Sequence, residues 1–353
     1  MRRLLMFVLM GALLFGAFRT PVAASDGREA ANPCLGENIL GCTHGLPSAQ
    51  YQLLLAQMLA HPTPNGRLVE VDQYAIYRHS LYQINRNGIT LYNAPNGAPI
   101  GSLPPGFIFV GMRQRQDGWA EVRPGQWTPL SELTGVPASR YSGVIVDMPF
   151  AYPMAWILQP TKPSSYPGAK PDPNTPFLDR YTRVNIYATV SDGAWDWYLI
   201  APGQWIEQRR VARIAKVEKP EGVKGRWVSV DLFEQVLTAY EDDRMVFTTL
   251  ISSGRPEWST NEGLFRIWAR FRSDGMSGGA GRADYYQLPA VPYVMYFDND
   301  IGLHGTYWHD SFGYRHSHGC VNLSISDARW LYEWTDNFFA DTWVYVWSSG
   351  QYR

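Results

Sequence analysis

From Leu68 to Thr134 the sequence alternates short apolar or aromatic runs with turn residues, a pattern that limits the region to small β-sheets. Ile89-Thr90-Leu91-Tyr92 is one such run and Phe107-Ile108-Phe109-Val110 is another. Asp117-Gly118 is a turn dipeptide that leads into a third run, which begins at Trp119. The whole chain contains 14 Trp, 21 Tyr, 25 Pro and 32 Gly, which favours strands and turns over long helices. We therefore expect a mainly β protein.

Part of this pattern is repeated downstream. Pro124-Gly125-Gln126-Trp127 returns as Pro202-Gly203-Gln204-Trp205, and each copy follows an Asp-Gly turn and a strand that contains Trp. We interpret the copies as two small β-modules, residues 67–140 and 141–218, whose size and turn–Trp–strand pattern resemble bacterial SH3-like modules. Such modules often bind cell wall in secreted proteins. Exposed Trp rings would indicate binding of glycan strands by stacking, whereas buried rings would indicate a packing role.

A proline-rich segment interrupts the second module. Residues 159–176 contain six prolines, which predicts a long loop without regular structure. Two interpretations are open: a flap that overhangs an active site, and a loop that only covers the surface.

The N-terminal residues show the pattern of an export signal. Two arginines precede an apolar run from Leu4 to Phe18, and a proline and Val22-Ala23-Ala24 follow it. This order is typical of a secretory signal peptide, here residues 1–24. An uncleaved membrane anchor is the alternative, although the run is short for a bilayer span. Either interpretation predicts an exported protein of the cell envelope or the extracellular space.

The three cysteines divide into a pair and a single residue. In an oxidising compartment, Cys34 and Cys42 can close a small disulfide loop, a clip worth roughly 2–3 kcal/mol in the chain-entropy model. Two unpaired thiols are the alternative. The surrounding N-terminal segment, residues 25–66, also predicts one short helix over residues 48–60, which ends before Pro62. Cys320 has no partner in this scheme and needs a separate explanation.

The charge balance excludes some partners. The chain has 31 Lys and Arg against 32 Asp and Glu, a formal net charge of −1 at pH 7. No global basic field exists, so neither nucleic acid nor an anionic membrane surface is an expected partner.

The third region, residues 219–350, is predicted to be mostly β with one short helix. Ser326 is the expected N-cap of a helix from Asp327 to Trp334, with Ala328, Leu331 and Trp334 on one face. Strands are expected at Trp227–Leu232, Val236–Tyr240, Met245–Leu250, Leu264–Ala269, Tyr293–Phe297 and Trp343–Trp347.

This region also contains the candidate reactive residues. Four histidines surround one cysteine between residues 303 and 322: His304, His309, His316 and His318. An adjacent imidazole lowers the pKa of a thiol and stabilises the thiolate, which is the nucleophilic form. Gly319 allows the backbone to approach a substrate carbonyl, so the amides of Gly319 and Cys320 can point to a developing oxyanion. We therefore expect Cys320 to be a nucleophile.

Other interpretations of the histidines exist. His316, His318 and Cys320 alternate and would share one face of a strand, which is a conceivable zinc ligand set. The catalytic interpretation explains the Ser-His-Gly-Cys turn more fully, so we expect no metal. Taken singly, His309 and His316 are interpreted as loop or surface residues.

Ser317-His318-Gly319-Cys320-Val321-Asn322, with His304-Gly305 upstream, resembles the signature of the YkuD-type L,D-transpeptidase catalytic domain. The resemblance extends over about residues 222–349, roughly a third of the chain, and implies a β-sandwich domain that needs no cofactor. Twelve residues separate His304 from Ser317, slightly fewer than the family usually shows.

The resemblance implies roles for individual residues. Cys320 is the nucleophile, His304 is its general base or acid, and the carbonyl of Gly305 orients His304. His318 and Gly319 line the catalytic turn. Substrate-binding positions are implied for Ser317, Asn322, Tyr307, Tyr293 and Met276, and Ser317 and Asn322 also hold the turn in shape.

The implied activity is that of a cysteine acyltransferase acting on peptidoglycan stem peptides. Cys320 attacks the amide before the terminal D-Ala of a tetrapeptide stem, D-Ala leaves, and a thioester forms. An amine then takes the acyl group in cross-linking, anchoring or D-amino-acid exchange. Water in that role would make the protein an L,D-carboxypeptidase. A non-catalytic cell-wall-binding protein is the alternative of a different class, and the presence of both Cys320 and His304 favours the enzyme.

Overall fold

The computed structural model describes residues 32–351. The predicted signal peptide, residues 1–24, lies outside these residues. Between residues 32 and 351, no helix is long and apolar enough to cross a membrane. The protein is mainly β, as predicted, with three α-helices in the described part: α1 (Ser48–Ala60), α2 (Gln73–Arg78) and α3 (Ile325–Thr335).

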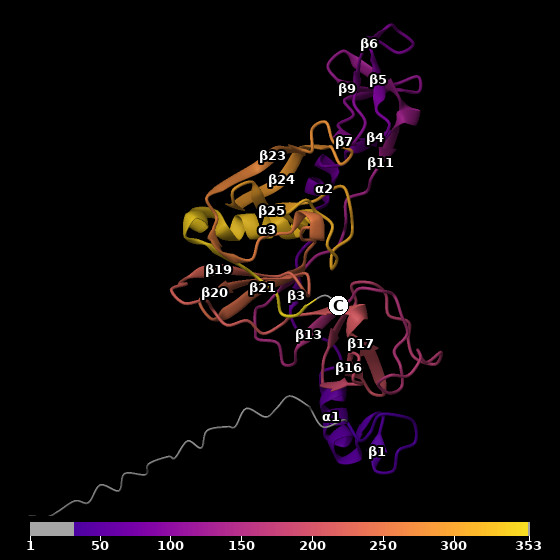
Figure 1. Ribbon diagram of the computed structural model, residues 1–353, viewed down its shortest axis with the longest axis vertical. Helices are drawn as coiled ribbons and strands as arrows, with labels where there is room; N and C mark the ends of the chain where they lie inside the picture. The colour runs from indigo at the N-terminus through magenta and orange to yellow at the C-terminus, as the bar shows by residue number, and fades with distance from the viewer. Residues whose placement is uncertain (1–31, 352–353) are drawn as a thin grey trace, which may run out of the picture.

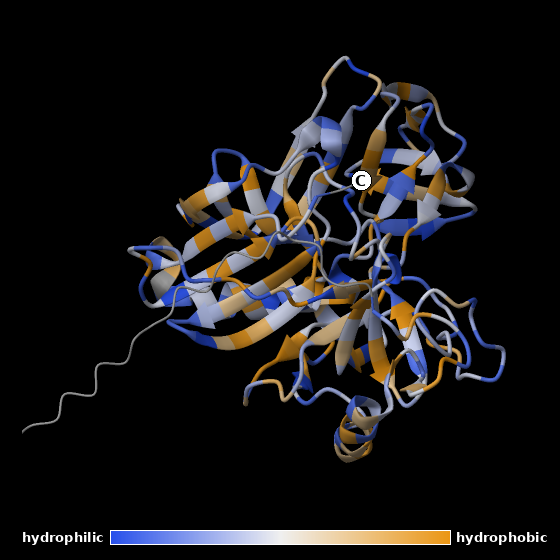
Figure 2. Ribbon diagram, turned by 60° about the horizontal axis from the view of Figure 1, so that its bottom comes forward, coloured by the Kyte–Doolittle hydropathy of each residue, from blue (hydrophilic) through white to orange (hydrophobic). Residues whose placement is uncertain are grey.

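Two large sheets enclose the main core. The first, which we call the β19–β21 sheet, has the order β22-β27-β19-β20-β21-β12-β3. Its strands are β3 (Arg67–Leu68), β12 (Val144–Ile145), β19 (Arg226–Asp231), β20 (Val236–Glu241), β21 (Arg244–Leu250), β22 (Gly263–Arg266) and β27 (Trp343–Trp347). The strands expected from the alternating pattern near residues 227, 236, 245 and 343 are all present in it. Figure 2 shows orange apolar segments alternating with pale and blue ones along many strands of the protein, and Val228, Val230 and Val344 of this sheet are buried in the main core.

The second sheet, which we call the shared sheet, has the order β11-β4-β7-β24-β25-β26, with β23 paired to β24. Its strands from the third region are β23 (Ala269–Gly278), β24 (Tyr286–Asp298), β25 (Ile301–Gly305) and β26 (Val321–Leu323). Helix α3 lies between the two sheets (Figure 1). Val230, Leu303 and Leu331, one from each layer, are fully buried together in the main core.

The first module supplies the remaining strands of the shared sheet. Its β7 pairs in parallel with β24, with Phe107 opposite Tyr286 and Ile108 opposite Gln287. The module also has its own five-stranded sheet, of order β6-β5-β10-β9-β8. Its elements are β4 (Tyr82–Ile84), β5 (Ile89–Tyr92), β6 (Pro99–Leu103), β7 (Phe107–Val110), β8 (Gln114–Gln116), β9 (Trp119–Arg123), β10 (Gln126–Pro129), the 3₁₀ helix η1 (Leu130–Glu132) and β11 (Leu133–Gly135).

The second module lies at the opposite end of the molecule from the first, with the two large sheets between them (Figure 1). It contains two three-stranded sheets, β14-β13-β18 and β15-β16-β17. Its elements are β13 (Met154–Ile157), β14 (Arg183–Asn185), β15 (Ala188–Ser191), β16 (Asp196–Ala201), β17 (Gln204–Glu207), the 3₁₀ helix η2 (Gln208–Arg210) and β18 (Val211–Arg213).

The repeated sequence has the same local structure in both modules. A strand, a Pro-Gly turn, a second strand, a 3₁₀ turn and a third strand follow one another in β9–η1–β11 and in β16–η2–β18. The turn glycines Gly125 and Gly203 both have positive φ, the conformation that favours glycine. Trp127, Trp197 and Trp205 are all at most 7% exposed, so these rings pack inside the modules. The resemblance of the modules to SH3-like folds stays a prediction.

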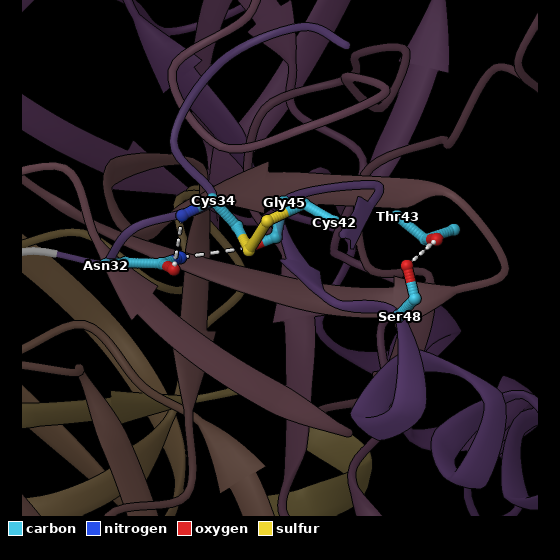
Figure 3. Close-up of a disulfide and its surroundings, with 6 residues drawn as sticks. All are labelled: Asn32, Cys34, Cys42, Thr43, Gly45 and Ser48. Carbon is cyan, nitrogen blue, oxygen red and sulfur yellow. Dashed lines mark hydrogen bonds between the residues drawn. A yellow bond between two sulfur atoms is a disulfide. The ribbon is translucent and has the colours of Figure 1, made fainter. Parts of the chain in front are cut away.

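The N-terminal segment is fastened to the second module. Cys34 and Cys42 are joined by a disulfide with a Cα–Cα distance of 5.6 Å, beside the short hairpin of β1 (Cys42–Thr43) and β2 (Leu46–Pro47) (Figure 3). The proline-rich loop packs here, because Ser164 bridges to Trp205 and His44 Nδ1 lies 3.1 Å from the carbonyl of Ser165. The loop therefore lies against the N-terminal segment, as a surface loop would.

One expectation from the sequence needs correction, and two elements were missed. The N-cap of α3 is Ser324, whose hydroxyl accepts the N–H of Asp327, so the helix begins at Ile325. Ser326 lies in the first turn and accepts the N–H of Asp72 instead. Helix α2 was not expected from the sequence, nor was the full length of the β23–β24 hairpin.

The predicted module ranges also contribute to the third region. Strand β3 comes from residues expected in the first module, and β12 from residues expected in the second, yet both complete the β19–β21 sheet beside β21. The carboxylate of Asp327 in α3 accepts the N–H of Gly143 at 2.8 Å, which fixes the linker before β12. The three regions are therefore joined by shared sheets and buried hydrogen bonds.

Candidate active site

A cavity of about 510 Å³ lies where the shared sheet meets the loop before β26. It is lined by four kinds of segment: the catalytic turn with Ser317, His318 and Cys320, strand β25 with His304, the β23–β24 hairpin, and the first module. The sequence motif predicted the first two segments.

Strand pairing explains why Cys320 and His304 face the same cavity. Strands β25 and β26 are parallel neighbours, and His304 lies opposite Asn322. Cys320 lies in the bend immediately before β26, two residues ahead of Asn322. Both side chains line the cavity. The strand register thus brings the predicted nucleophile and base together.

The orientation of the His304 ring leaves one nitrogen available. His304 is 2% exposed, and its Nδ1 lies 3.1 Å from the carbonyl oxygen of Gly305, which can only accept a hydrogen bond. The ring proton of the neutral imidazole therefore occupies Nδ1, and Nε2 is free to accept a proton. Burial lowers the pKa of His304 to about 4, so the ring is neutral near pH 7.

The thiol of Cys320 differs from the sequence expectation. Burial raises its pKa to about 11, so the thiol and not the thiolate is the resting form. Its Sγ donates to the carbonyl oxygen of Asp300 at 3.7 Å. The expected lowering of the pKa by a neighbouring imidazole was wrong for this state, because the buried imidazole carries no positive charge to stabilise a thiolate.

The catalytic turn is held by Ser317. Its Oγ donates to the carbonyl of Cys320 at 2.5 Å and accepts the N–H of Gly319 at 3.1 Å. Gly319 has a φ of +121°, which explains the glycine by backbone conformation, since a Cβ there would meet Ile301 only at ordinary contact distance. The amide of Gly319, expected to face an oxyanion, is thus engaged by Ser317 in this state.

The side chain of His309 contacts the side chain of Asn322. The N–H of Ser311 donates to His309 Nδ1 at 3.0 Å, so the proton of the neutral ring lies on Nε2. Nε2 of His309 lies 2.8 Å from Nδ2 of Asn322. In this orientation both atoms are donors that face each other, and Oδ1 of Asn322 is buried without a partner. Turning the amide by 180° lets Nε2–H of His309 donate to Oδ1 and places the amide nitrogen in the buried position on the side away from His309. Burial holds the pKa of His309 well below its usual range.

His318 is part of a polar cluster on the cavity wall. Its Nε2 lies 3.2 Å from the guanidinium of Arg255, a group that only donates, so Nε2 accepts. The same nitrogen is 3.9 Å from Asp284 Oδ2. Burial, followed by the charge of Arg255, lowers the pKa of His318. His318 is therefore a neutral wall residue in this arrangement.

The structure brings some of the predicted substrate-binding residues to the cavity and leaves others away from it. Met276, Ser317 and Asn322 line it. Tyr307 is 1% exposed, donates its hydroxyl to the carbonyl of Pro289 and packs in the core, so Trp308 takes the expected place on the cavity wall. Tyr293 lines a separate hollow of about 190 Å³ beside α2. For Tyr307 and Tyr293 the expectation was wrong, because the loop and strand turn these rings inward or to another face.

Residues 225–346 match the family model of the YkuD L,D-transpeptidase catalytic domain. This match confirms the resemblance noted in the sequence, and we call residues 225–346 the YkuD region.

The chain is also similar to proteins with curated names or solved structures. A Bacillus subtilis (strain 168) protein with the name "Putative L,D-transpeptidase YciB" is 26% identical over 125 residues, which cover 30% of this chain and 59% of that protein. The L,D-transpeptidase of Stackebrandtia nassauensis is 31% identical, with 38% of this chain and 62% of that chain covered and a TM-score of 0.30. The catalytic domain of the E. faecium L,D-transpeptidase is 27% identical, with 36% and 99% covered and a TM-score of 0.32. The chain spans less than two thirds of the length of the first two relatives.

Sequence reasoning missed several residues at the site. His309 was interpreted as a loop or surface residue; it lies in the loop after β25, but it is only 8% exposed and is hydrogen-bonded to Asn322. Arg86 and Phe107 of the first module also line the cavity, more than 200 positions before Cys320 in the sequence. No sequence signal connects these two residues to the motif, because β7 reaches the site only through pairing with β24. Within the described residues, no group of three or more His, Cys, Asp and Glu is arranged to hold a metal ion.

Proposed function

We propose that the protein is an exported L,D-transpeptidase that acts on peptidoglycan stem peptides through a thioester on Cys320. The observation that carries this proposal is the shared cavity of Cys320 and His304, in which Gly305 keeps Nδ1 of His304 protonated and Nε2 open. The match of the YkuD region to an L,D-transpeptidase catalytic domain supports the same reaction class.

The protonation states favour general-base catalysis over a preformed ion pair. With a thiol pKa of about 11 and an imidazole pKa of about 4, both groups are neutral at pH 7. The thiol turns from the Asp300 carbonyl toward His304 and gives its proton to Nε2 as the sulfur attacks the carbonyl carbon. The negative charge that develops on the carbonyl oxygen needs donors, and the candidates are the N–H of Cys320 and, once released by Ser317, the N–H of Gly319.

The remaining steps return both groups to their starting states. The imidazolium gives its proton to the departing amine of D-Ala, the C–N bond breaks, and a thioester joins Cys320 to the third residue of the stem. An acceptor amine then attacks the thioester and passes a proton through His304 to the sulfur. Attack by water would give an L,D-carboxypeptidase, and the cavity geometry alone favours neither acceptor.

Export is part of the proposal. The disulfide between Cys34 and Cys42 supports it, because such bonds form and persist mainly in oxidising compartments. The N-terminal pattern of an export signal supports the same location. The buried rings of Trp127, Trp197 and Trp205 do not support glycan stacking at the repeated positions, so a purely cell-wall-binding function is the weaker candidate.

Intact-mass analysis after exposure to a carbapenem tests the nucleophile. We expect the wild-type protein to gain the mass of one inhibitor molecule and the Cys320→Ala variant to gain none. Identical masses for the two proteins would refute the proposal. Incubation with a tetrapeptide stem then identifies the acceptor: a cross-linked dimer or an exchanged D-amino acid indicates transpeptidation, and free tripeptide indicates carboxypeptidation.

A further inference from the structure

The first module forms one wall of the cavity that contains Cys320. Arg86, Pro105, Gly106 and Phe107 line this cavity together with the catalytic turn. All four come from the part of the module nearest β24, and none belongs to the YkuD region of residues 225–346.

This wall is held firmly against the β23–β24 hairpin. Phe107 donates its N–H to the carbonyl of Tyr285 at 2.9 Å, at the start of the parallel pairing of β7 with β24. A Cβ on Gly106 would lie 2.7 Å from the same carbonyl oxygen, so the close approach requires glycine. Phe109 is 2% exposed and packs edge-on against Tyr307, with ring centroids 5.5 Å apart. The module is therefore docked through backbone pairing and a buried core.

Arg86 is fixed at the rim of this wall. It lies in the turn after β4, where Gly88 donates its N–H to the carbonyl of Asn85 at 2.9 Å. The carbonyl of Arg86 accepts the N–H of Gly106 at 3.0 Å, and its guanidinium lies 5.4 Å from the ring centroid of Phe107. Arg86 is an exposed residue whose backbone is held in the turn and whose guanidinium lies beside one aromatic ring of the wall.

The charges around the cavity make Arg86 different from the other cations. In the described part of the chain, the Arg, Lys, Asp and Glu residues that line the cavity are Arg86, Arg255, Arg282 and Asp284. Arg255 contacts His318 at 3.2 Å, and Arg282 pairs with Asp284 at 3.2 Å. Among the hydrogen bonds and ion pairs of residues 32–351, none engages the guanidinium of Arg86. The residues that line the cavity therefore carry more positive than negative charge, and the guanidinium of Arg86 has N–H donors available for a ligand.

From these contacts we propose that Arg86 of the first module binds a carboxylate of the peptide substrate and so makes this module a specificity-determining wall of the active site. The inference rests on the proposed function, because it names a group of that function's substrate. A guanidinium pairs with a carboxylate through two parallel hydrogen bonds, a geometry that lysine does not reproduce. Two substrate carboxylates fit this chemistry: the terminal carboxylate of the stem and a side-chain carboxylate on its third residue.

Steady-state kinetics of the full chain with a tetrapeptide stem test the inference. We expect Arg86→Ala to raise KM by about tenfold or more, as loss of a charge-assisted hydrogen bond does, with a smaller change in kcat. Arg86→Lys should recover only part of the loss. The matched control is Arg115→Ala, which removes an exposed arginine from β8 of the same module, away from the cavity. An equal KM for Arg86→Ala, Arg115→Ala and wild type would overturn the inference.

Modified substrates identify the carboxylate. One tetrapeptide carries a terminal amide and another carries an amide on its third side chain. The wild-type protein should lose affinity for the peptide whose amide replaces the carboxylate that Arg86 binds, and Arg86→Ala should not distinguish that peptide from the unmodified one. If Arg86→Ala discriminates against both amidated peptides as strongly as wild type does, the inference is wrong.

A binding measurement separates this inference from the proposed function. Calorimetric titration of unmodified tetrapeptide into Cys320→Ala, with and without Arg86→Ala, requires no turnover. Tighter binding with Arg86 present supports the proposed role of Arg86, even if the wild-type protein releases no D-Ala. Failure to release D-Ala would refute only the proposed function. Equal binding by Cys320→Ala with and without Arg86→Ala would overturn the proposed role of Arg86, whether or not the wild-type protein turns over the peptide.

Discussion

The buried state of His304 predicts an unusual pH dependence for acylation of Cys320. An ordinary histidine has a pKa of about 6.5, so only about 9% of it is neutral at about pH 5.5. Burial lowers the pKa of His304 to about 4, because the surrounding core disfavours the imidazolium. With that value, about 97% of His304 is still the neutral base at about pH 5.5. We therefore expect nearly the same acylation rate at about pH 5.5 as at about pH 7.5, and a tenfold fall per pH unit only below about pH 4.

The rate is measured by stopped-flow mixing with a carbapenem and observed as the loss of the inhibitor's absorbance. Cys320→Ala at each pH corrects for spontaneous hydrolysis of the inhibitor. Near-ultraviolet circular dichroism at each pH verifies the fold, which is needed because burial raises the pKa of Asp327 to about 6 and that of Glu234 to about 7. A rate that drops about tenfold between about pH 7.5 and about pH 5.5, with the fold intact, would refute a buried neutral base.

The variant His304→Gln gives the second half of this test. Glutamine is similar in size to histidine but cannot accept the thiol proton as a base. Loss of a general base typically slows a reaction by about 10²–10⁴-fold, and we expect a loss within this range at about pH 7.5. If His304→Gln acylates as fast as wild type, Cys320 is activated by another group.

Three further changes have defined expected outcomes. His309→Phe keeps a ring but leaves the Asn322 amide buried without its partner, so the free energy of unfolding in urea should fall by about 1–3 kcal/mol; an unchanged value would show that Asn322 does not depend on His309. Asp327→Ala removes the acceptor of two buried hydrogen bonds and should cost about 2–4 kcal/mol by the same assay, whereas a cost below about 0.5 kcal/mol, the usual scale of a surface change, would contradict its linking role. The double variant Cys34→Ser/Cys42→Ser should lower the melting temperature under non-reducing conditions and leave carbapenem acylation unchanged, since the disulfide lies in the N-terminal segment next to the second module; slower acylation would indicate coupling between this segment and the site.

Local patterns in the sequence were sufficient for elements whose stability depends on their own periodicity. The helix from Ser48 to Ala60 and the strands near residues 227, 236 and 245 lie where alternation and turn residues placed them. The β23–β24 hairpin was not predicted in full, because β23 is rich in Arg, Ser, Asp and Gly, and β24 contains Pro289 and Pro292, which cannot donate to a ladder. Its strands depend on pairing with each other and with β7 and β25, which no short window contains.

The candidate site shows the same difference between local sequence patterns and contacts of distant segments. The motif located Cys320, Ser317 and Gly319 because a tight turn fixes their relation within four residues. His304 was located by the resemblance of His304-Gly305 to the family signature, and the structure adds that its strand is the parallel neighbour of the strand after Cys320. Tyr307 was misplaced because an aromatic residue in a loop gives no sign of which way its ring turns.

Sheet completion explains why the cavity belongs to the whole chain and not to the YkuD region alone. Without the preceding residues, β21 would lose β12 as its neighbour and β24 would lose β7, which leaves two exposed strand edges. Val291, Val294 and Ile325 share a buried cluster with Phe109 of the first module, so removal of that module would also expose apolar surface beside the catalytic strands. Because the same docking places Phe107 and Arg86 on the cavity wall, a change that loosens the module should affect stability and substrate selection together.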